Sequence, residues 1–458
     1  MSATDTAERS APALPDGLVV VVKRDCPTCV AVAPVLTQLA ETGGGPGVTV
    51  VSQDDPGFPG PDALDDTSLD ISWQLGIETV PTLLRLDGGA ETARVVGWHR
   101  DRWEELTGMR GLGPTLPDQR PGCGSRTLEP GLAEALDVRH RGGLMRSRRV
   151  TLSPLEDDFE AMWERGWTDG LPVVTPTESR VLAMLGGTAR RPDEVVAVVP
   201  PNLVSVTVEK VAVNAVMAGC RPEYLPVVLA AIEAACTDEF NIHGVLATTY
   251  SVGPVVIVSG PVARAIGVNS GVNVLGQGYR ANSTIGRALQ LVVRNIGGGL
   301  PGGVDRATLG NPGKVGLCIA EDEEGSPWEP LSVWRGVPAG RSAVTVVAGG
   351  GVRTAADQLS RTAEDLTRNL ARSLRGQDSL LIVSPDHGRL YREAGWSRAR
   401  LADALAELVP TRPGLAGSNP VELLIMYAGG RAGLFSGVME GWVGGATGSV
   451  PVTVEVRP

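Results

Sequence analysis

The first regular pattern of hydrophobic residues along the chain is the run LVVVVK at 18–23. A short β-branched run of this kind is typical of a buried strand. The next segment, VAVAPVLTQLAETGGG (30–45), has apolar residues at helical spacing and ends in glycines, which stop helices. We therefore expect a β–α–β module closed by a hairpin and a helix, with further strands at 48–53, 79–84 and 91–98 and helices at 69–76 and 99–107.

Strand-like and helix-like segments alternate through residues 151–458, with many glycines at the joins. This alternation predicts an α/β region with a largely parallel sheet. We expect a division near residue 340, which gives a substrate-binding lobe at 151–340 and a second α/β lobe at 341–458. The expected helices cover 210–219, 222–236, 284–295, 354–375 and 398–408, and the expected strands cover 195–199, 245–250, 254–259, 315–319, 343–347, 379–384, 421–427 and 450–456.

The region between these two patterned parts has a different composition. Residues 109–150 are rich in Gly, Pro and Arg, most densely at 109–131. Such a composition predicts a linker or an irregular strap, which we place at 111–150. We expect the first domain to cover 17–110 and residues 1–16 to be disordered.

The length and the net charge of the chain limit the number of domains and the kinds of partner that we expect. A chain of 458 residues is too long for one compact core. The net charge is −11 and no basic stripe stands out, which argues against a nucleic-acid partner. No apolar run approaches the roughly 20 residues of a membrane span, and the first residues lack the pattern of a signal peptide. We expect a cytoplasmic protein with no membrane partner, and a homodimer as the default oligomer.

The chain has six cysteines, and two of them form the motif Cys26-Pro27-Thr28-Cys29. The motif lies where the first strand passes into the first helix. A helix N-terminus carries a partial positive charge, which favours a thiolate and lowers the pKa of Cys26. Cys29 lies one turn further on, where it can close or resolve a disulfide. In a chain of this kind such cysteines indicate redox chemistry more than a disulfide framework.

The N-terminal segment resembles the thioredoxin superfamily through this CxxC motif, the sequence Val80-Pro81-Thr82 and the pair Gly97-Trp98. The resemblance implies a thioredoxin-like domain, a cis-proline at Pro81 facing the dithiol, and thiol–disulfide exchange without another cofactor. The tryptophan that usually precedes the first cysteine is replaced by Asp25. The redox potential and the partners of thioredoxins therefore cannot be transferred to this protein. A metal site and a scaffold with unused cysteines remain as alternatives.

Cys123 lies between glycines in the Gly/Pro-rich segment. A thiol on a flexible segment can shuttle between the dithiol and a second site. The alternative is a tethered strap with an incidental cysteine.

Polar residues in the C-terminal region cluster at the joins between expected elements. Glu209 and Lys210 open one helix, and Cys220 follows its end at a turn. His243 is a candidate general base or metal ligand. These four residues are our candidates for catalysis there, with a buried thiol and a structural histidine as alternatives. We assign none of these residues to a metal site.

A glycine-rich loop at 269–287 is the candidate binding site for a carboxylate or phosphate. Glycines let the backbone approach a ligand, and arginines beside a helix N-terminus can bind an anion. The alternative is a turn with structural caps. The candidate residues are Asn269, Ser270, Asn273, Arg280, Asn282, Thr284 and Arg287.

The C-terminal region also resembles a set of bacterial proteins of unassigned function that are often fused to a thioredoxin-like domain. The phrases that carry this resemblance are RGWTDGLPVV (165–174), VNAVMAGCRPEYLPVVLAAIEAA (213–235), NSGVNVLGQGYRANSTIGRA (269–288) and EDEEGSPWEPLSV (321–333). The resemblance supplies neither a substrate nor an assigned residue.

Together these features predict a thiol-dependent redox enzyme. The dithiol module would reduce a thiol or intermediate of a C-terminal catalytic region that acts on a small anionic molecule. An external thiol reductant would then restore the dithiol. The alternatives are a soft-metal or sulfur carrier that uses Cys26 and Cys29, and a C-terminal hydrolase or lyase with a regulatory thioredoxin-like arm.

Overall fold

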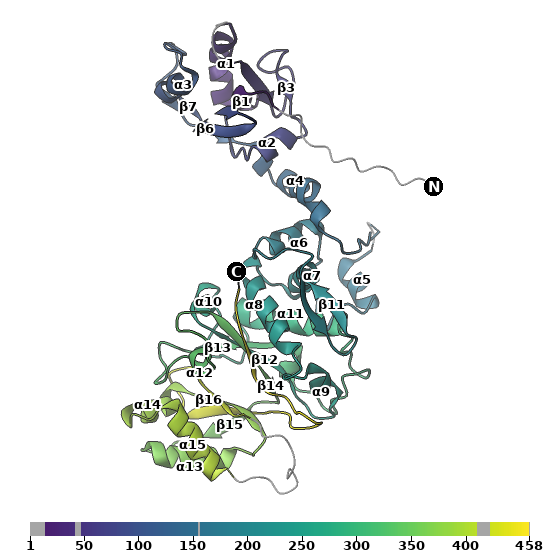
Figure 1. Ribbon diagram of the computed structural model, residues 1–458, viewed down its shortest axis with the longest axis vertical. Helices are drawn as coiled ribbons and strands as arrows, with labels where there is room; N and C mark the ends of the chain where they lie inside the picture. Colours follow the sequence, from purple (N-terminus) through teal and green to yellow (C-terminus); the bar gives the residue numbers. More distant parts are fainter. Residues whose placement is uncertain (1–13, 42–46, 154–155, 410–421, 458) are drawn as a thin grey trace. The chain divides into compact units, whose positions relative to one another are not determined.

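The computed structural model describes residues 14–41, 47–153, 156–409 and 422–457 (Figure 1). The first part of the predicted disordered N-terminus, residues 1–13, lies outside the described residues. Contacts divide the chain into two compact units, Met1–Gly142 and Gly143–Pro458, here called unit 1 and unit 2. Helices and strands are mixed in both units, as the sequence pattern predicts. None of the described helices is long and apolar enough to cross a membrane.

The described part of unit 1 is built on a five-stranded sheet in the order β3-β2-β1-β5-β6. The strands are β1 (Gly17–Val22), β2 (Val48–Ser52), β3 (Leu64–Asp65), β5 (Thr82–Asp87) and β6 (Ala90–Val96). β2 runs parallel to β1 and β3 runs parallel to β2, whereas β5 is antiparallel to both β1 and β6. β1 is central and almost fully buried, which explains its uninterrupted apolar sequence.

Three helices follow the expected order in unit 1: α1 (Pro27–Glu41), α2 (Asp70–Gln74) and α3 (Arg100–Thr107). The short strand β4 (Thr79–Val80) leads into a cis peptide bond between Val80 and Pro81. Trp98 and Trp103 are fully buried in the core of unit 1 and pack edge to face. The predicted strand–helix junction at Cys26 is present between β1 and α1.

The segment after α3 is part of unit 1, which differs from the predicted linker at 111–150. It contains β8 (Gln119–Arg120), β9 (Cys123–Gly124), the 3₁₀ helix η1 (Arg126–Leu128) and α4 (Leu132–Arg141). β8 pairs with β7 (Trp98–His99), and β9 pairs with β4. We call residues 119–128 the strap. Its composition resembles that of a linker because distant side chains, and not its own apolar residues, hold it in place.

Unit 2 begins with a largely helical half that packs around α7, α8 and α11. Its main core contains buried Val, Ala, Leu and Ile residues from these three helices and from the neighbouring sheet. A short hairpin precedes α7. The elements are α5 (Asp158–Glu164), α6 (Glu178–Leu185), β10 (Val195–Val199), β11 (Val204–Thr207), α7 (Val208–Ala218), η3 (Pro222–Tyr224), α8 (Leu225–Ala235), α9 (Ile242–Ala247), α10 (Pro261–Ala265) and α11 (Arg280–Asn295).

The first sheet of unit 2 joins segments from both sides of residue 340. Its order is β13 (Leu317–Ala320), β12 (Gly253–Ser259), β14 (Ala343–Gly349) and β19 (Val452–Glu455). β12 and β14 pair along seven residues each. The predicted boundary between lobes at 340 and 341 is therefore wrong, because it separates neighbouring strands of one sheet.

A second four-stranded sheet has the order β15 (Arg353–Ala356), β18 (Phe435–Glu440), β16 (Asp378–Val383) and β17 (Leu424–Tyr427). Figure 1 shows α13 (Ala363–Ser373), α14 (Pro385–Glu393) and α15 (Arg398–Leu408) beside this sheet. The short elements η4 (Pro312–Val315) and α12 (Leu331–Trp334) complete the described part of unit 2.

The predicted largely parallel sheet is also wrong. In the described part of the two larger sheets of unit 2, only the β12–β13 and β16–β17 pairings are parallel, and the rest are antiparallel. Side chains from both sheets share one apolar cluster, which includes Val255, Val347, Leu380 and Met439. Strands covered on both faces have continuous apolar sequences whatever their direction, so the pattern resembles that of a parallel sheet.

Candidate functional site

Cys26 lies at the N-terminus of α1, where β1 ends. Its Sγ atom accepts a hydrogen bond from the backbone N–H of Cys29 at 3.3 Å. The same sulfur lies 3.5 Å from the carbonyl oxygen of Val80. Val80 precedes the cis bond to Pro81, so the dithiol and this proline are close neighbours. Cys26, Cys29 and Pro81 are thus brought together as the sequence predicts.

Cys123 is the third cysteine of this site. β9 pairs with β4 in antiparallel register, which sets Cys123 opposite Val80. The Cys123 side chain is also one of the groups that lower the pKa of Cys26. Cys26 therefore has a thiol neighbour on the strap as well as one on its own helix.

The surroundings of the three cysteines shift their pKa values in different directions. Burial acts to raise the pKa of Cys26, but hydrogen bonds from Cys123, from Cys29 and from the backbone N–H of Thr28 together lower it. Burial raises the pKa of Cys29, and the negative charge of Cys26 raises it further. The pKa of Cys123 is raised by the same two causes. Of these three cysteines, Cys26 is the one whose pKa is lowered.

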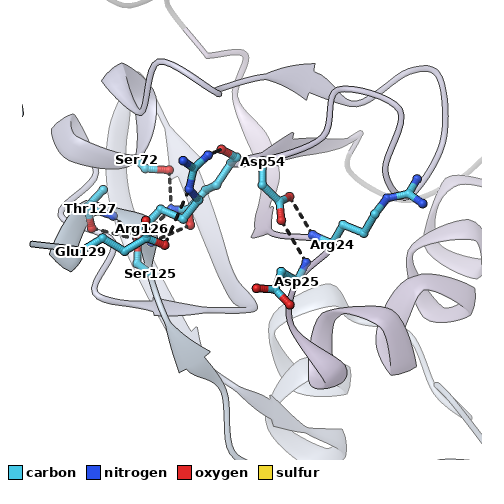
Figure 2. A network of polar contacts seen from close by, with 9 residues as sticks. Arg24, Asp25, Asp54, Ser72, Ser125, Arg126, Thr127 and Glu129 are labelled. Carbon is cyan, nitrogen blue, oxygen red and sulfur yellow. Dashed lines mark hydrogen bonds and ion pairs between the residues drawn. The ribbon is translucent and has the colours of Figure 1, made fainter. Parts of the chain in front are cut away.

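The turn before Cys26 is fixed by a carboxylate from the end of β2. Asp54 accepts the backbone N–H of Arg24 at 2.7 Å and that of Asp25 at 2.9 Å. Figure 2 shows the Asp54 side chain facing this turn. The guanidinium of Arg24 also pairs with Asp55 at 2.5 Å. These contacts hold the chain where it enters α1.

The buried side chain of Gln53 anchors the strap beyond Cys123. Its Nε2 donates to Ser72 Oγ at 2.9 Å and to Ser125 Oγ at 2.7 Å, and its Oε1 accepts the backbone N–H of Arg126 at 3.1 Å. Thr127 Oγ1 donates to the carbonyl oxygen of Ile77 at 2.6 Å. Figure 2 shows Ser72, Ser125, Arg126 and Thr127 gathered in this network.

Sequence analysis did not single out Gln53 or Asp54. Both follow β2, a strand adjacent to β1 in the sheet and parallel to it. Polar residues at the carboxyl ends of neighbouring parallel strands meet at one edge of a sheet, which is where α/β proteins place their sites. The polar pair Gln53-Asp54, at the end of the predicted strand 48–53, was therefore the sequence signal that could have revealed this site.

The residues of the strap that precede Cys123 pack closely against α1 and β4. Thr28 Oγ1 donates to the carbonyl oxygen of Pro121 at 2.7 Å. A Cβ atom added at Gly122 would lie 2.4 Å from Thr79 Cγ2 and 2.7 Å from the carbonyl oxygen of Val80. Only glycine allows β9 to approach β4 this closely.

The structure does not gather the candidate catalytic residues of unit 2 into one site. Glu209 is buried and accepts the backbone N–H groups of Arg146 and Ser147 at 2.9 and 2.8 Å. Lys210 is exposed beside it. Cys220 follows the other end of α7, an 11-residue helix that is about 16 Å long.

The cysteines of unit 2 are buried or partly buried, whereas His243 is exposed. Cys220 donates to the carbonyl oxygen of Thr284 at 3.4 Å, and burial raises its pKa to about 12. Burial also raises the pKa of Cys236 to about 12, and it raises that of Cys318. His243 is exposed in the first turn of α9.

The polar residues of the 269–287 loop contact one another and the rest of unit 2. Asn269 and Asn282 exchange hydrogen bonds between backbone and side chain at 2.7 and 3.1 Å. Arg287 makes a two-pronged ion pair with Asp169 at 2.7 and 2.8 Å. These internal contacts match the alternative of structural caps.

The other candidate residues of this loop also have internal contacts. Arg280 Nε donates to the carbonyl oxygen of Gly219 at 2.9 Å, and Thr284 Oγ1 donates to that of Arg280 at 2.8 Å. Asn273 has a left-handed φ of 58° and donates to the carbonyl oxygen of Gln277 at 2.9 Å. The carbonyl oxygen of Ser270 accepts the N–H of Gly429 at 2.8 Å.

Comparison of the chain with family models, curated proteins and solved structures finds no match. Among the residues that the structure describes, no group of three or more His, Cys, Asp or Glu side chains is arranged to hold a metal ion. The three cysteines of unit 1 are the candidate functional site.

Proposed function

We propose that unit 1 is a thioredoxin-like domain that carries out thiol–disulfide exchange with Cys26 as the nucleophile. The observation that carries the proposal is the set of donors around Cys26 Sγ. The backbone N–H of Cys29 donates to this sulfur, and the thiols of Cys29 and Cys123 also lower its pKa although burial opposes this. A thiolate held at a helix N-terminus is the reactive species in this chemistry.

The reaction needs only the residues of the cluster and a disulfide substrate. The Cys26 thiolate attacks one sulfur of the substrate, and the other sulfur leaves as a thiolate. Cys29 then loses its proton to that leaving group and attacks Cys26. The second substrate thiolate leaves as the Cys26–Cys29 disulfide forms. Two thiols of the chain are oxidised, and one substrate disulfide is reduced to two thiols.

The fold of unit 1 supports the thioredoxin-like part of the proposal. The resemblance implies a dithiol at a strand–helix junction and a cis-proline facing it. The described structure has Cys26 between β1 and α1 and a cis bond at Pro81, with Val80 in contact with Cys26.

A wider proposal, in which the dithiol serves a catalytic thiol in unit 2, has less support. Burial raises the pKa values of Cys220 and Cys236 to about 12, so both are protonated near neutral pH. Glu209 binds two backbone N–H groups of its own unit and is not free to act on a substrate.

The test is oxidation of the fully reduced chain by glutathione disulfide, with the released glutathione measured over time. Wild-type protein should react and lose two thiols. Cys26→Ser should release the second glutathione at least about a hundredfold more slowly, because the thiolate that forms the internal disulfide is gone. Cys236→Ser, a partly exposed thiol in unit 2, is the matched control and should react like wild type. Equal rates for Cys26→Ser and wild type would contradict the proposal.

A further inference from the structure

Cys123, on the strap, is the most exposed of the three cysteines described in unit 1. Cys26 and Cys29 have exposed fractions of 1% and 0%, whereas Cys123 is partly exposed. Cys123 lies opposite Val80, whose carbonyl oxygen lies 3.5 Å from Cys26 Sγ. Cys123 is thus the cysteine of this group that solvent reaches, and Cys26 and Cys29 are buried behind it.

Contacts on both sides of Cys123 keep the thiol in this position. The carbonyl oxygen of Pro121 accepts from Thr28, and Gly122 fits against Thr79 and Val80 with no room for a Cβ atom. On the other side Ser125 and Arg126 are tied to the buried Gln53. A cysteine that is incidental to a flexible tether would need none of these contacts.

We propose that Cys123 is the outer thiol of a three-cysteine relay, which passes electrons from Cys29 through Cys26 to an external disulfide. The inference rests on the proposed exchange at Cys26: the disulfide that Cys26 attacks is then the mixed disulfide that Cys123 has formed with the external substrate. A Cys26–Cys123 disulfide is then an intermediate on the path to the Cys26–Cys29 disulfide.

Each step of the relay is an exchange in which one sulfur replaces another. Cys123 attacks an external disulfide, forms a mixed disulfide, and its proton leaves with the first substrate thiol. The Cys26 thiolate attacks the Cys123 sulfur, and the second substrate thiolate leaves. Cys29 attacks Cys26, its proton passes to Cys123, and Cys123 returns to the thiol form. In sum, Cys26 and Cys29 are oxidised and the external disulfide is reduced.

The test traps the intermediate by removing the last thiol. The reduced full chain with Cys29→Ser is treated with glutathione disulfide, quenched with acid, and mapped by mass spectrometry without reduction. We expect a Cys26–Cys123 disulfide and release of both glutathione halves. In Cys26→Ser/Cys29→Ser, glutathione should instead stay on Cys123. Glutathione that persists on Cys26 in Cys29→Ser itself would overturn the relay.

Gly122 and Gly124 provide a matched pair of variants that tests the close approach of β9 to β4. In the Cys29→Ser background, Gly122→Ala forces β9 away from β4, whereas a Cβ atom at Gly124 meets nothing within 4 Å. Gly122→Ala should slow formation of the Cys26–Cys123 disulfide by about tenfold or more, and Gly124→Ala should not. Equal rates in the two variants would overturn the role of the strap.

The outcomes also separate the relay from the proposed function. If glutathione adds to Cys26 but no Cys26–Cys123 disulfide forms, only the relay fails. If Cys26 reacts in none of the variants, the nucleophile itself is wrong and both proposals fail.

Discussion

The carboxylate of Asp54 accepts the backbone N–H of Arg24 at 2.7 Å, and its second oxygen accepts the next N–H at 2.9 Å. These bonds connect the end of β2 to the turn that delivers Cys26 to α1. A charged acceptor that serves two backbone donors is worth more than a neutral one. The position of the nucleophile thus depends on a residue outside the CxxC motif.

Replacement of Asp54 should therefore destabilise unit 1. Asp54→Ala leaves two backbone donors without their acceptor, and we expect the free energy of unfolding to fall by about 1–3 kcal/mol. Hydrogen exchange of the β1 amides in the full chain would measure it, because those amides report on unit 1 alone. Asp62→Ala, an exposed aspartate in the same loop, should change stability by less than about 0.5 kcal/mol. Equal effects of the two variants would contradict this role of Asp54.

Gln53 should control the order of the strap. Gln53→Leu keeps the volume of the buried side chain but removes three hydrogen bonds to Ser72, Ser125 and Arg126. We expect a loss of about 3 kcal/mol, because each unmet buried partner costs about 1 kcal/mol or more.

The measurement for Gln53 is backbone hydrogen exchange. In Gln53→Leu the amides of residues 119–128 should exchange faster than in wild type, whereas those of the central strand β1 should change less. Unchanged exchange in the strap would show that other contacts hold it.

Unit 2 contains a buried ion pair whose disruption should be costly. Arg398 Nη2 donates to Glu321 Oε1 at 2.6 Å, and the two side chains have exposed fractions of 1% and 0%. Arg398→Met leaves the buried carboxylate without its partner, and we expect a loss of about 3–5 kcal/mol in urea unfolding. Arg398→Met/Glu321→Gln should recover at least half of that loss. A double variant that is no more stable than Arg398→Met would contradict this explanation.

Asp357 should make the stability of unit 2 depend on pH in the acid range. Burial acts to raise its pKa, but hydrogen bonds from Ser360, Asn369 and Leu359 lower it to about 2. Because the folded pKa is depressed, the stabilisation is present above the unfolded value of 3.8 and is lost as the pH falls through about 2.

The matched variant for this effect is Asp357→Asn. We expect it to be less stable than wild type by about 1 kcal/mol at neutral pH, after allowance for solvent screening. The difference in unfolding free energy should shrink as the pH is lowered toward 2. A difference that stays constant with pH would mean that the carboxylate charge is not the cause.

Much of the local geometry at Cys26 could be predicted because its determinants are adjacent in sequence. A β-branched run, a CxxC motif and an amphipathic segment define a strand, a turn and a helix without further information. The pairing of Cys123 with Val80 depends instead on contacts between residues more than 40 positions apart. Composition alone therefore made the strap look like a linker.

The layout of unit 2 was less predictable for a related reason. The sequences of β12 and β14 show that both strands are buried, but a continuous apolar run does not reveal its direction or its partner. The 269–287 loop shows the same limit for polar residues. Whether Arg287 binds an anion or an internal carboxylate depends on Asp169, which lies 118 positions away.

The most direct test of the account is the titration of Cys26 itself. The ultraviolet absorbance of thiolate would be followed against pH in the reduced full chain and in Cys26→Ser. We predict that wild type shows a thiolate that titrates below the ordinary cysteine pKa of 9.0 and that this component is missing from Cys26→Ser. Identical curves below that pH would show that Cys26 is not an activated thiolate, and the proposed exchange chemistry would be wrong.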